Sequence, residues 1–377
     1  MTQQKLSKVD KLYENIAKGR TGKNRGITTG LEGMDDITTG NHKGTFYLIA
    51  GSTGSGKSTL AIYSYIYAPL MDGGLLGSDT YKIIYFSLEM NAEILLAKLL
   101  CMYLADQMGI EISFNEVLSR REVLSDELYD KVLEAKEWLT EVAKHLIIFD
   151  RELTSKGLEI FLEGFSNRIG TWERTTNEET FTPHNPDVYY GVVVDHVGLI
   201  KPLPGQDKRT AMDATSDVAI RFRNKCGMSI IFVMQTNRGA SSMDRRMEHM
   251  QDPELSDLKG SGGPGEAAEV IFSLFYPARE KMPNWKEFNV KVLGDGLRGL
   301  FCLKNRFGDA NLAKPLMFFG RSGIFKELPK DAKMVNEKAA YFRSLMHFNK
   351  GIESDDNSNP DETNDENDNH DYQFVIG

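Results

Sequence analysis

The sequence predicts an α/β fold in which a mainly parallel central sheet carries antiparallel strands at one edge. Three observations lead to this prediction. A glycine-rich G-x-x-x-x-G-K-S segment lies between an apolar run and a helical run. Short apolar runs alternate with longer helical ones, as in buried parallel strands joined by crossover helices. Nearer the C-terminus, apolar runs follow one another without helices, which indicates antiparallel additions to the sheet.

The first expected element is a short amphipathic helix over residues 7–18, which Gly19 would end. Its apolar face consists of Val9, Leu12, Tyr13 and Ile16. The expected strands follow, in the order TFYLIAG, YKIIYFSLE, HLIIFD, YYGVVVDHVGLI, MSIIFVMQTN, EVIFSLFYP, FNVKVLG, GLFCLKN and PLMFFG. The polar segment from Gly170 to Asp187 has no period, and we expect it to form an extended surface loop.

The composition is that of an ordinary globular protein, with 41% hydrophobic and 26% charged residues. No apolar run approaches the roughly 18 residues that span a bilayer, so we expect a cytosolic protein without a membrane partner. The net charge of −9 comes from the tail beyond Gly351, which holds nine acids and no Lys or Arg. Because the remainder is neutral, a nucleic-acid partner is not excluded. Cys101, Cys226 and Cys302 are expected to be reduced core residues.

The glycine-rich segment, LIAGSTGSGKSTL, predicts a phosphate-binding loop for a nucleoside triphosphate. Backbone N–H groups at a helix N-terminus would surround the phosphates, Lys57 would neutralise their charge, and Ser58 would hold Mg²⁺. A glycine-rich turn with an exposed lysine is the alternative. The residues expected to bind ATP are Gly51, Gly54, Ser55, Gly56, Lys57, Ser58 and Thr59.

Three further strand ends carry polar side chains that could meet the nucleotide, because the carboxyl ends of parallel strands share one edge of a sheet. Asp195 ends GVVVD and would hold magnesium, directly or through water. Glu89 ends IIYFSLE and could deprotonate the attacking water, although a glutamate favoured by a helix N-terminus is the alternative. Gln235 and Arg238 end IIFVMQTNR, and an amide there could sense the γ-phosphate.

The order of the segments is more specific than any one of them. In chain order they are GITTGLEGMDDITTG, the phosphate loop, FSLEM, VVVDHVGLI, VMQTNR, LSDLKGSGGPGEAAEVIF and LKNRFG. Over residues 26 to about 327 this succession resembles the motor domain of the DnaB-like replicative helicases, which are RecA-type hexameric ring motors. The resemblance implies a RecA-like P-loop NTPase core and an ATP- and Mg²⁺-dependent helicase that moves 5′ to 3′ on single-stranded DNA and unwinds duplex.

The resemblance also implies roles for particular residues. Glu89 would be the catalytic base, Asp195 the second magnesium ligand and Gln235 the γ-phosphate sensor. In LKNRFG, Arg306 resembles an arginine finger and Lys304 its companion, and both would reach the nucleotide of the neighbouring subunit. Such fingers contribute about 10³ to 10⁵ in rate. Without the motif order, these two cations would be interpreted as charges that keep an edge strand soluble.

Two segments resemble the family's DNA-binding loops, residues 201–217 and 238–262. Neither contains an aromatic residue, so we expect contacts with phosphates rather than stacked bases. A solvated basic loop without function is the alternative for either. The candidate DNA contacts are Lys201, Lys208, Arg209, Arg245, Arg246, Lys259 and Gly260.

We expect four parts: an N-terminal linker helix over 1–25, a motor over 26–330, a helical segment over 331–350 and an acidic tail over 351–377, which is too polar to pack and should be disordered. Such helicases usually carry a helical domain or a primase ahead of the motor. The 25 residues found here are expected of a phage or plasmid type whose priming comes from another protein. The linker helix would dock on a neighbouring subunit. The segment GGPGEAAEV is richer in glycine than is usual in the family.

The tail ends in an apolar tip, DYQFVIG, after its run of acids. It resembles the tails by which single-strand-binding proteins and some phage helicases recruit polymerases and other replication partners, although a merely solubilising tail is the alternative. For the whole chain, two other functions remain open at this point. One is a RecA-like recombinase, which forms open filaments, and the other is a KaiC-like regulatory ATPase, which binds a protein partner instead of DNA.

Overall fold

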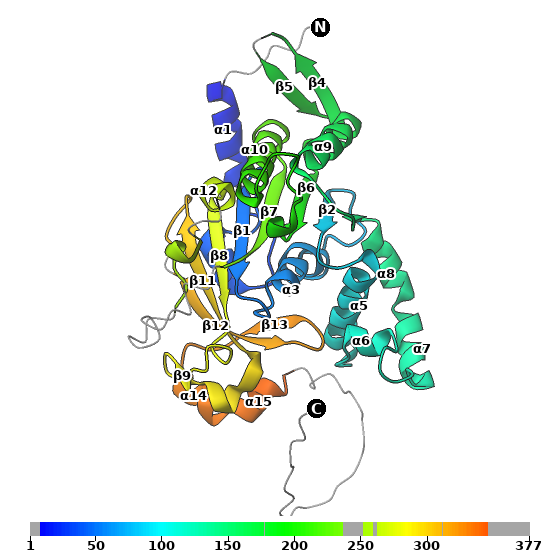
Figure 1. The fold of residues 1–377 in the computed structure, drawn as a ribbon, viewed down its shortest axis with the longest axis vertical. Coiled ribbons are helices and arrows are strands. Elements are labelled where there is room, and N and C mark those ends of the chain that lie inside the picture. The colour runs from blue at the N-terminus through cyan, green and yellow to red at the C-terminus, as the bar shows by residue number, and fades with distance from the viewer. Residues whose placement is uncertain (1–7, 177, 237–251, 259–261, 311, 346–377) are drawn as a thin grey trace, which may run out of the picture.

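A computed structural model of the protein describes residues 8–176, 178–236, 252–258, 262–310 and 312–345 (Figure 1). Its centre is a nine-stranded sheet in the order β13-β12-β11-β8-β1-β7-β6-β2-β3. The strands of the sheet are β1 (Phe46–Gly51), β2 (Tyr81–Ser87), β3 (Leu146–Phe149), β6 (Tyr189–Asp195), β7 (Ser229–Gln235), β8 (Val270–Phe275), β11 (Leu297–Asn305), β12 (Leu312–Phe319) and β13 (Ile324–Glu327). From β3 to β8 the neighbours are parallel, and β11, β12 and β13 continue the sheet antiparallel. The predicted α/β class is confirmed.

Helices cover both faces of the sheet. The longer ones are α1 (Lys8–Gly19), α5 (Ala92–Met108), α7 (Asp126–Glu134), α8 (Lys136–Ala143), α9 (Ser155–Ile169) and α10 (Lys208–Cys226). The shorter ones are α2 (Glu32–Thr38), α3 (Lys57–Ile62), which a π-helical turn (Tyr63–Tyr67) joins to α4 (Ala68–Met71), α6 (Phe114–Val117), α12 (Gly263–Ala267), α13 (Val290–Leu293), α14 (Ala332–Glu337) and α15 (Ala339–Arg343). Single turns of 3-10 helix are Val197–Leu199, Leu255–Leu258 and Gly294–Gly296.

The central strand β1 shows why its sequence is apolar throughout. Tyr47 and Ile49 pack in the core that α3, α4, α5 and α8 cover, whereas Phe46, Leu48 and Ala50 pack in the core beneath α9 and α10. All six residues of the strand are buried. Burying a Leu or Ile side chain stabilises a fold by about 1.5–3 kcal/mol, so a strand between two helical layers selects apolar residues at every position.

The segment between Gly170 and Asp187 is not the extended loop predicted from its polarity. It contains a hairpin of β4 (Gly170–Arg174) and β5 (Glu179–Pro183), which contacts α9 and α10 at one end of the molecule (Figure 1). Trp172 pairs with Phe181 across the hairpin, with ring centroids 5.2 Å apart. Trp172 also contacts Phe222 of α10, and an ionic cluster around Arg221 joins the hairpin to α9 and α10, so the hairpin needs no apolar period of its own.

Three other expectations were wrong in detail. The run FNVKVLG forms the short strand β10 (Phe288–Asn289), which pairs with β9 (Asn284–Trp285), and then helix α13. Strand β8 pairs parallel with β1, so the antiparallel edge starts only at β11. The expected DNA loop over 201–217 is a loop only as far as Asp207, whose side chain caps α10 by accepting from the N–H of Thr210 at 2.7 Å.

The expected N-terminal helix is present as α1, and it ends at Gly19 as predicted. Its apolar residues Val9, Leu12, Tyr13 and Ile16 are each at least half exposed in the single chain. Within the described ranges, the structure holds no helix of the length and apolar character that crossing a membrane requires.

Candidate nucleotide site

The phosphate loop joins the carboxyl end of β1 to the first turn of α3, as its motif requires. Gly54 and Gly56 have φ angles of 77° and 101°, which only glycine adopts without strain. A Cβ atom on Gly51 would lie 2.6 Å from Ser55 Oγ and 2.8 Å from the Leu274 carbonyl oxygen. The loop is therefore tight enough to direct backbone N–H groups at an anion in front of the α3 N-terminus.

Ser58 and Asp195 come together beside this loop. Ser58 Oγ donates to Asp195 Oδ1 at 2.9 Å, and the phenol of Tyr85 donates to Oδ2 at 2.8 Å. Burial raises the pKa of Asp195, and the hydrogen bonds from Tyr85 and Ser58 act in the opposite direction. A hydroxyl and a carboxylate beside a phosphate site are the ligands that Mg²⁺ uses with a bound nucleotide, so the residues present fit the ion.

Protein side chains alone do not form a metal site in the described part of the chain, which has no group of three or more His, Cys, Asp or Glu residues able to hold an ion. Mg²⁺ with a bound nucleotide keeps several waters and uses one or two protein oxygens together with substrate phosphates.

Lys57 and Glu89 lie at the same edge. Lys57 is buried, and burial lowers its pKa, while the charges of Glu89 and Asp195 raise it and that of Arg279 lowers it further. Glu89 follows β2 and is exposed, so its carboxylate is open to solvent beside the lysine. The predicted base, phosphate cation and magnesium carboxylate are thus brought together by three different strand ends.

Gln235 is the last residue of β7 and pairs with Gly51 at the entrance to the phosphate loop. Its side chain is exposed, and the N–H of the following Thr236 donates to the Gly51 carbonyl at 3.1 Å. An amide at this position faces the same edge of the sheet as Asp195 and Glu89, as the sequence predicted.

The structure adds cations and a phenol that sequence reasoning missed. Lys98 of α5 places Nζ 3.5 Å from Thr59 Oγ1, and burial lowers its pKa while Asp195 and Glu89 raise it. Arg279 donates to the Thr53 carbonyl, and Arg298 donates to the Ser55 carbonyl, so both touch the loop backbone. The sequence did carry a signal for two of them, because each is a single charge inside an otherwise apolar run. Lys98 lies in ILLAKLLCMYLA and Arg298 lies in GLRGLFCL.

Lys304 and Arg306 lie at the opposite edge of the sheet from the phosphate loop of their own chain. Asn305, between them, pairs with Val270 at the start of β8, whereas Gly51 pairs with Leu274 near its end. Four residues of strand separate these levels, about 13 Å at 3.3 Å per residue. Neither cation is therefore placed to meet the nucleotide of its own chain.

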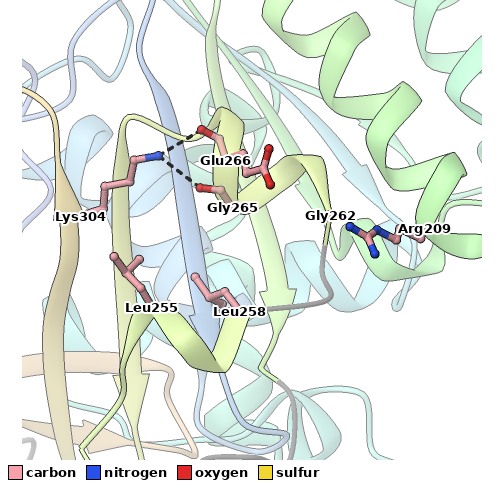
Figure 2. A pocket seen from close by; sticks show the side chains of 7 residues that line it. All are labelled: Arg209, Leu255, Leu258, Gly262, Gly265, Glu266 and Lys304. Atoms are coloured by element: carbon pink, nitrogen blue, oxygen red, sulfur yellow. Dashed lines mark hydrogen bonds between the residues drawn. The ribbon is translucent and has the colours of Figure 1, made fainter.

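A pocket of about 350 Å³ opens beside Lys304 (Figure 2). Lys304 Nζ donates to the carbonyls of Gly265 and Glu266 at 3.3 and 3.1 Å, and Arg306 Nη2 reaches the Glu266 carbonyl at 3.5 Å. Both cations are thus held by neutral carbonyls near α12. The other residues that line the pocket are Arg209, Leu255, Leu258 and Gly262.

The structure describes three of the candidate DNA contacts, which are Lys201, Lys208 and Arg209. Lys208 and Arg209 are exposed at the first turn of α10, and Arg209 borders the pocket. Lys201 lies 3.1 Å from Glu152, an exposed ion pair that adds little stability. The remaining candidates lie outside the described residues, and they are Arg245, Arg246, Lys259 and Gly260. Arg238, which was named with Gln235, also lies outside them.

The sequence-based comparisons decide the family. A family model described as the DnaB-like helicase C terminal domain matches residues 26–327. The chain belongs to this family. The replicative DNA helicases DnaB of Mycoplasma pneumoniae and Helicobacter pylori are each 24% identical to this DnaB-like chain, over 253 and 271 residues. These matches cover 66% and 71% of this chain and 46% and 47% of the relatives, so the chain spans about half the length of the curated relatives it matches.

Solved structures agree in fold. The ATPase domain of G40P superimposes on this DnaB-like chain with a TM-score of 0.64 and 17% identity, over 86% of this chain and 100% of that one. A DnaB-like replicative helicase, solved in a study of its interactions with primase, superimposes with a TM-score of 0.62 and 17% identity. The superposition covers 87% of this chain and 68% of that one. The fold is therefore that of the RecA-like P-loop ATPases, as the sequence predicted.

Proposed function

We propose that this chain is the motor of an ATP-driven replicative DNA helicase that assembles into a ring of six subunits and moves on single-stranded DNA. One observation carries the proposal beyond family membership: Lys304 and Arg306 stand about 13 Å, or four residues of strand, from the level of their own phosphate loop. This position suits a finger that serves the nucleotide of a neighbouring copy, so hydrolysis would require subunits in head-to-tail contact.

Within one site, different residues of the chain bind the phosphates, hold the magnesium and accept the proton. The loop N–H groups and Lys57 bind the phosphates, and Ser58 with Asp195 holds the magnesium. An ion held by these two residues would supply positive charge that offsets the negative charge of the phosphates. Glu89 accepts the proton of the attacking water, and Gln235 contacts the γ-phosphate from the adjacent strand end.

From the neighbouring subunit, Arg306 and Lys304 leave the carbonyls of α12 and bind the phosphates of the adjoining site. Exchanging neutral carbonyls for phosphate oxygens strengthens their electrostatic contacts, which favours the assembled state. Because the same α12 follows the second candidate DNA loop, this exchange also gives DNA a route to affect hydrolysis.

Helix α1 would hold the ring together. Its four apolar side chains are at least half exposed in the single chain, and covering such a face on a neighbouring subunit removes it from water. Lys208 and Arg209, with the basic residues of the second loop, would contact the backbone of the DNA strand in the channel. By family resemblance the direction is 5′ to 3′.

The tail would recruit a replication partner, such as a primase, a polymerase or a single-strand-binding protein. Its nine acids are suited to a basic surface, and its apolar tip is suited to a pocket on the partner. By the same family resemblance, the complete assembly works in the cytoplasm on replicating DNA.

Unwinding of forked DNA with a single 5′ or 3′ tail tests the proposal most directly. We expect ATP- and Mg²⁺-dependent unwinding of the 5′-tailed fork and closed rings by electron microscopy. Open filaments with strand exchange would identify a recombinase instead. Absence of salt-dependent binding to an oligonucleotide would identify a regulatory ATPase without a DNA substrate.

A further inference from the structure

Arg298, the second residue of β11, is a charged side chain inside the protein. Its side chain is 3% exposed. Nε donates to the Ser55 carbonyl at 2.7 Å, and Nη1 donates to the carbonyls of Asp295 and Leu297 at 2.5 and 2.9 Å. The guanidinium carbon lies 3.6 Å from the centroid of the Tyr276 ring. The Phe318 ring centroid lies 5.1 Å from the same carbon, so three carbonyls and two aromatic rings surround the side chain.

Burying this charge costs stability that an apolar residue would not cost. Burial lowers the pKa of Arg298 to about 10, which leaves the group charged at neutral pH. Buried ion pairs are often no more stable than well-packed apolar residues of similar volume, and here the described partners are neutral carbonyls. A charge kept in such a place points to a task other than packing, and its hydrogen bond to the Ser55 carbonyl reaches the phosphate loop.

The bonded carbonyl belongs to a peptide unit that matters for phosphate binding. A peptide bond is planar and trans, so the Ser55 carbonyl and the Gly56 N–H point in opposite directions. Holding the carbonyl toward Arg298 therefore turns the Gly56 N–H to the other side of the loop. Gly56 has a φ of 101°, in a region where glycine moves freely, so its own backbone does not fix this orientation.

We propose that Arg298 is a positioning residue that orients the Ser55–Gly56 peptide for phosphate binding in its own subunit. The same strand thereby acts on two sites, because Arg298 stands at the end of β11 near its own loop and Arg306 follows the other end, which faces the neighbour. The assignment of that second site rests on the proposed function, whereas the action of Arg298 on its own loop needs only nucleotide binding.

Arg298→Lys tests the first part, because a lysine keeps the charge and the apolar stem but lacks the planar fork. We expect the Kd for fluorescently labelled ADP with Mg²⁺ to rise about tenfold or more, as loss of a hydrogen bond to a charged group predicts. Phe301→Leu is the matched control: Phe301 lies buried on the same strand and packs against Phe275, so the change should lower the Tm without changing the Kd.

An Arg298→Lys protein that binds ADP within twofold of wild type would overturn the proposal and leave Arg298 as a packing residue. If this variant does not fold, Tyr276→Leu carries the test. It removes the ring under the guanidinium but keeps Arg298, and it should weaken ADP binding in the same direction. An unchanged Kd in the folded Tyr276→Leu protein would count against the proposal equally.

Mixed oligomers show which site Arg298 serves. Arg298→Lys subunits keep Arg306, and Arg306→Ala subunits keep a sound loop. Mixing them should restore hydrolysis with a KM near that of wild type, at sites joining a sound loop to an intact finger. Suppose that Lys57→Ala and Arg306→Ala subunits complement each other but this pair does not. Arg298 would then support the finger instead of its own loop, and the proposal would be overturned. Failure of that second pair as well would instead refute the trans finger, and the ADP Kd would still decide on Arg298.

Discussion

Tyr85 and Asp195 are joined across two neighbouring strands by a hydrogen bond of 2.8 Å from the phenol to Oδ2. Strands β2 and β6 run parallel with Ser87 opposite Asp195, which brings the phenol, two residues back, beneath the carboxylate. Ser58 donates to the other oxygen. Both oxygens of this buried carboxylate therefore accept from hydroxyl groups, which favours the ionised form that a magnesium ion needs.

Tyr85→Phe should move the acid limb of ATP hydrolysis to higher pH. Burial already raises the pKa of Asp195, and the Tyr85 hydrogen bond lowers it. Removing that bond raises the pKa further, so the carboxyl becomes protonated, and loses magnesium, at a higher pH as the solution is acidified. The measurement is kcat/KM against pH at saturating Mg²⁺.

Tyr81→Phe is the control for this prediction. Tyr81 lies on the same strand, is equally buried, and donates to the Tyr65 carbonyl at 2.7 Å instead of to a carboxylate. Its loss should cost about 1 kcal/mol of stability, as for an ordinary buried hydrogen bond, and leave the acid limb in place. Equal shifts in the two variants would mean that Tyr85 acts only through stability.

Glu89→Gln should bind ATP and assemble like wild type while losing at least 99% of hydrolysis, about a hundredfold, because an amide cannot accept the proton of the attacking water. Glu93→Gln, an exposed change in the first turn of α5, is the control and should retain full activity. ATP turnover by Glu89→Gln at the wild-type rate would show that another group is the base.

Arg306→Ala and Lys57→Ala should each be inactive alone and should recover part of the hydrolysis when mixed. The recovered sites join an intact loop from one variant to an intact finger from the other. Mixing Lys57→Ala with Asp195→Asn is the control, since both changes damage the same half of the site and should not complement. Mixtures that co-assemble without any recovery would argue against a finger in trans.

Part of the nucleotide edge was predictable because its polar residues come at the ends of continuous apolar runs. Asp195 and Gln235 are the last residues of buried strands and Glu89 closely follows one, and parallel strands bring their carboxyl ends together without further information. The phosphate loop was predictable for a local reason, since its glycines meet a backbone requirement that sequence spacing records.

Contacts made between distant segments were not predictable. Arg298 reaches a carbonyl 243 positions away, and only the pairing of β11 with β8 places it there. The β4–β5 hairpin was missed because its stability comes from Trp172 and from ion pairs with α9 and α10 instead of from an alternating pattern. Helix α13 was missed because four residues of VKVL fit a strand as well as a helix, and the Asn289 cap decided the outcome.

Deleting residues 353–377 should leave ATP hydrolysis and unwinding of naked forks within twofold of wild type, because the acids of this tail repel DNA and the motor's catalytic residues all precede it. The same deletion should weaken binding to the cognate polymerase, primase or single-strand-binding protein, together with any DNA synthesis coupled to unwinding.

Phe374→Ser separates the two features of the tail, since it keeps every acid and removes the aromatic anchor. We expect it to reproduce most of the loss, with the remaining binding becoming more sensitive to salt. A truncated protein that no longer unwinds DNA by itself would show that the tail belongs to the motor, and full partner binding by both variants would leave the tail a solubilising segment.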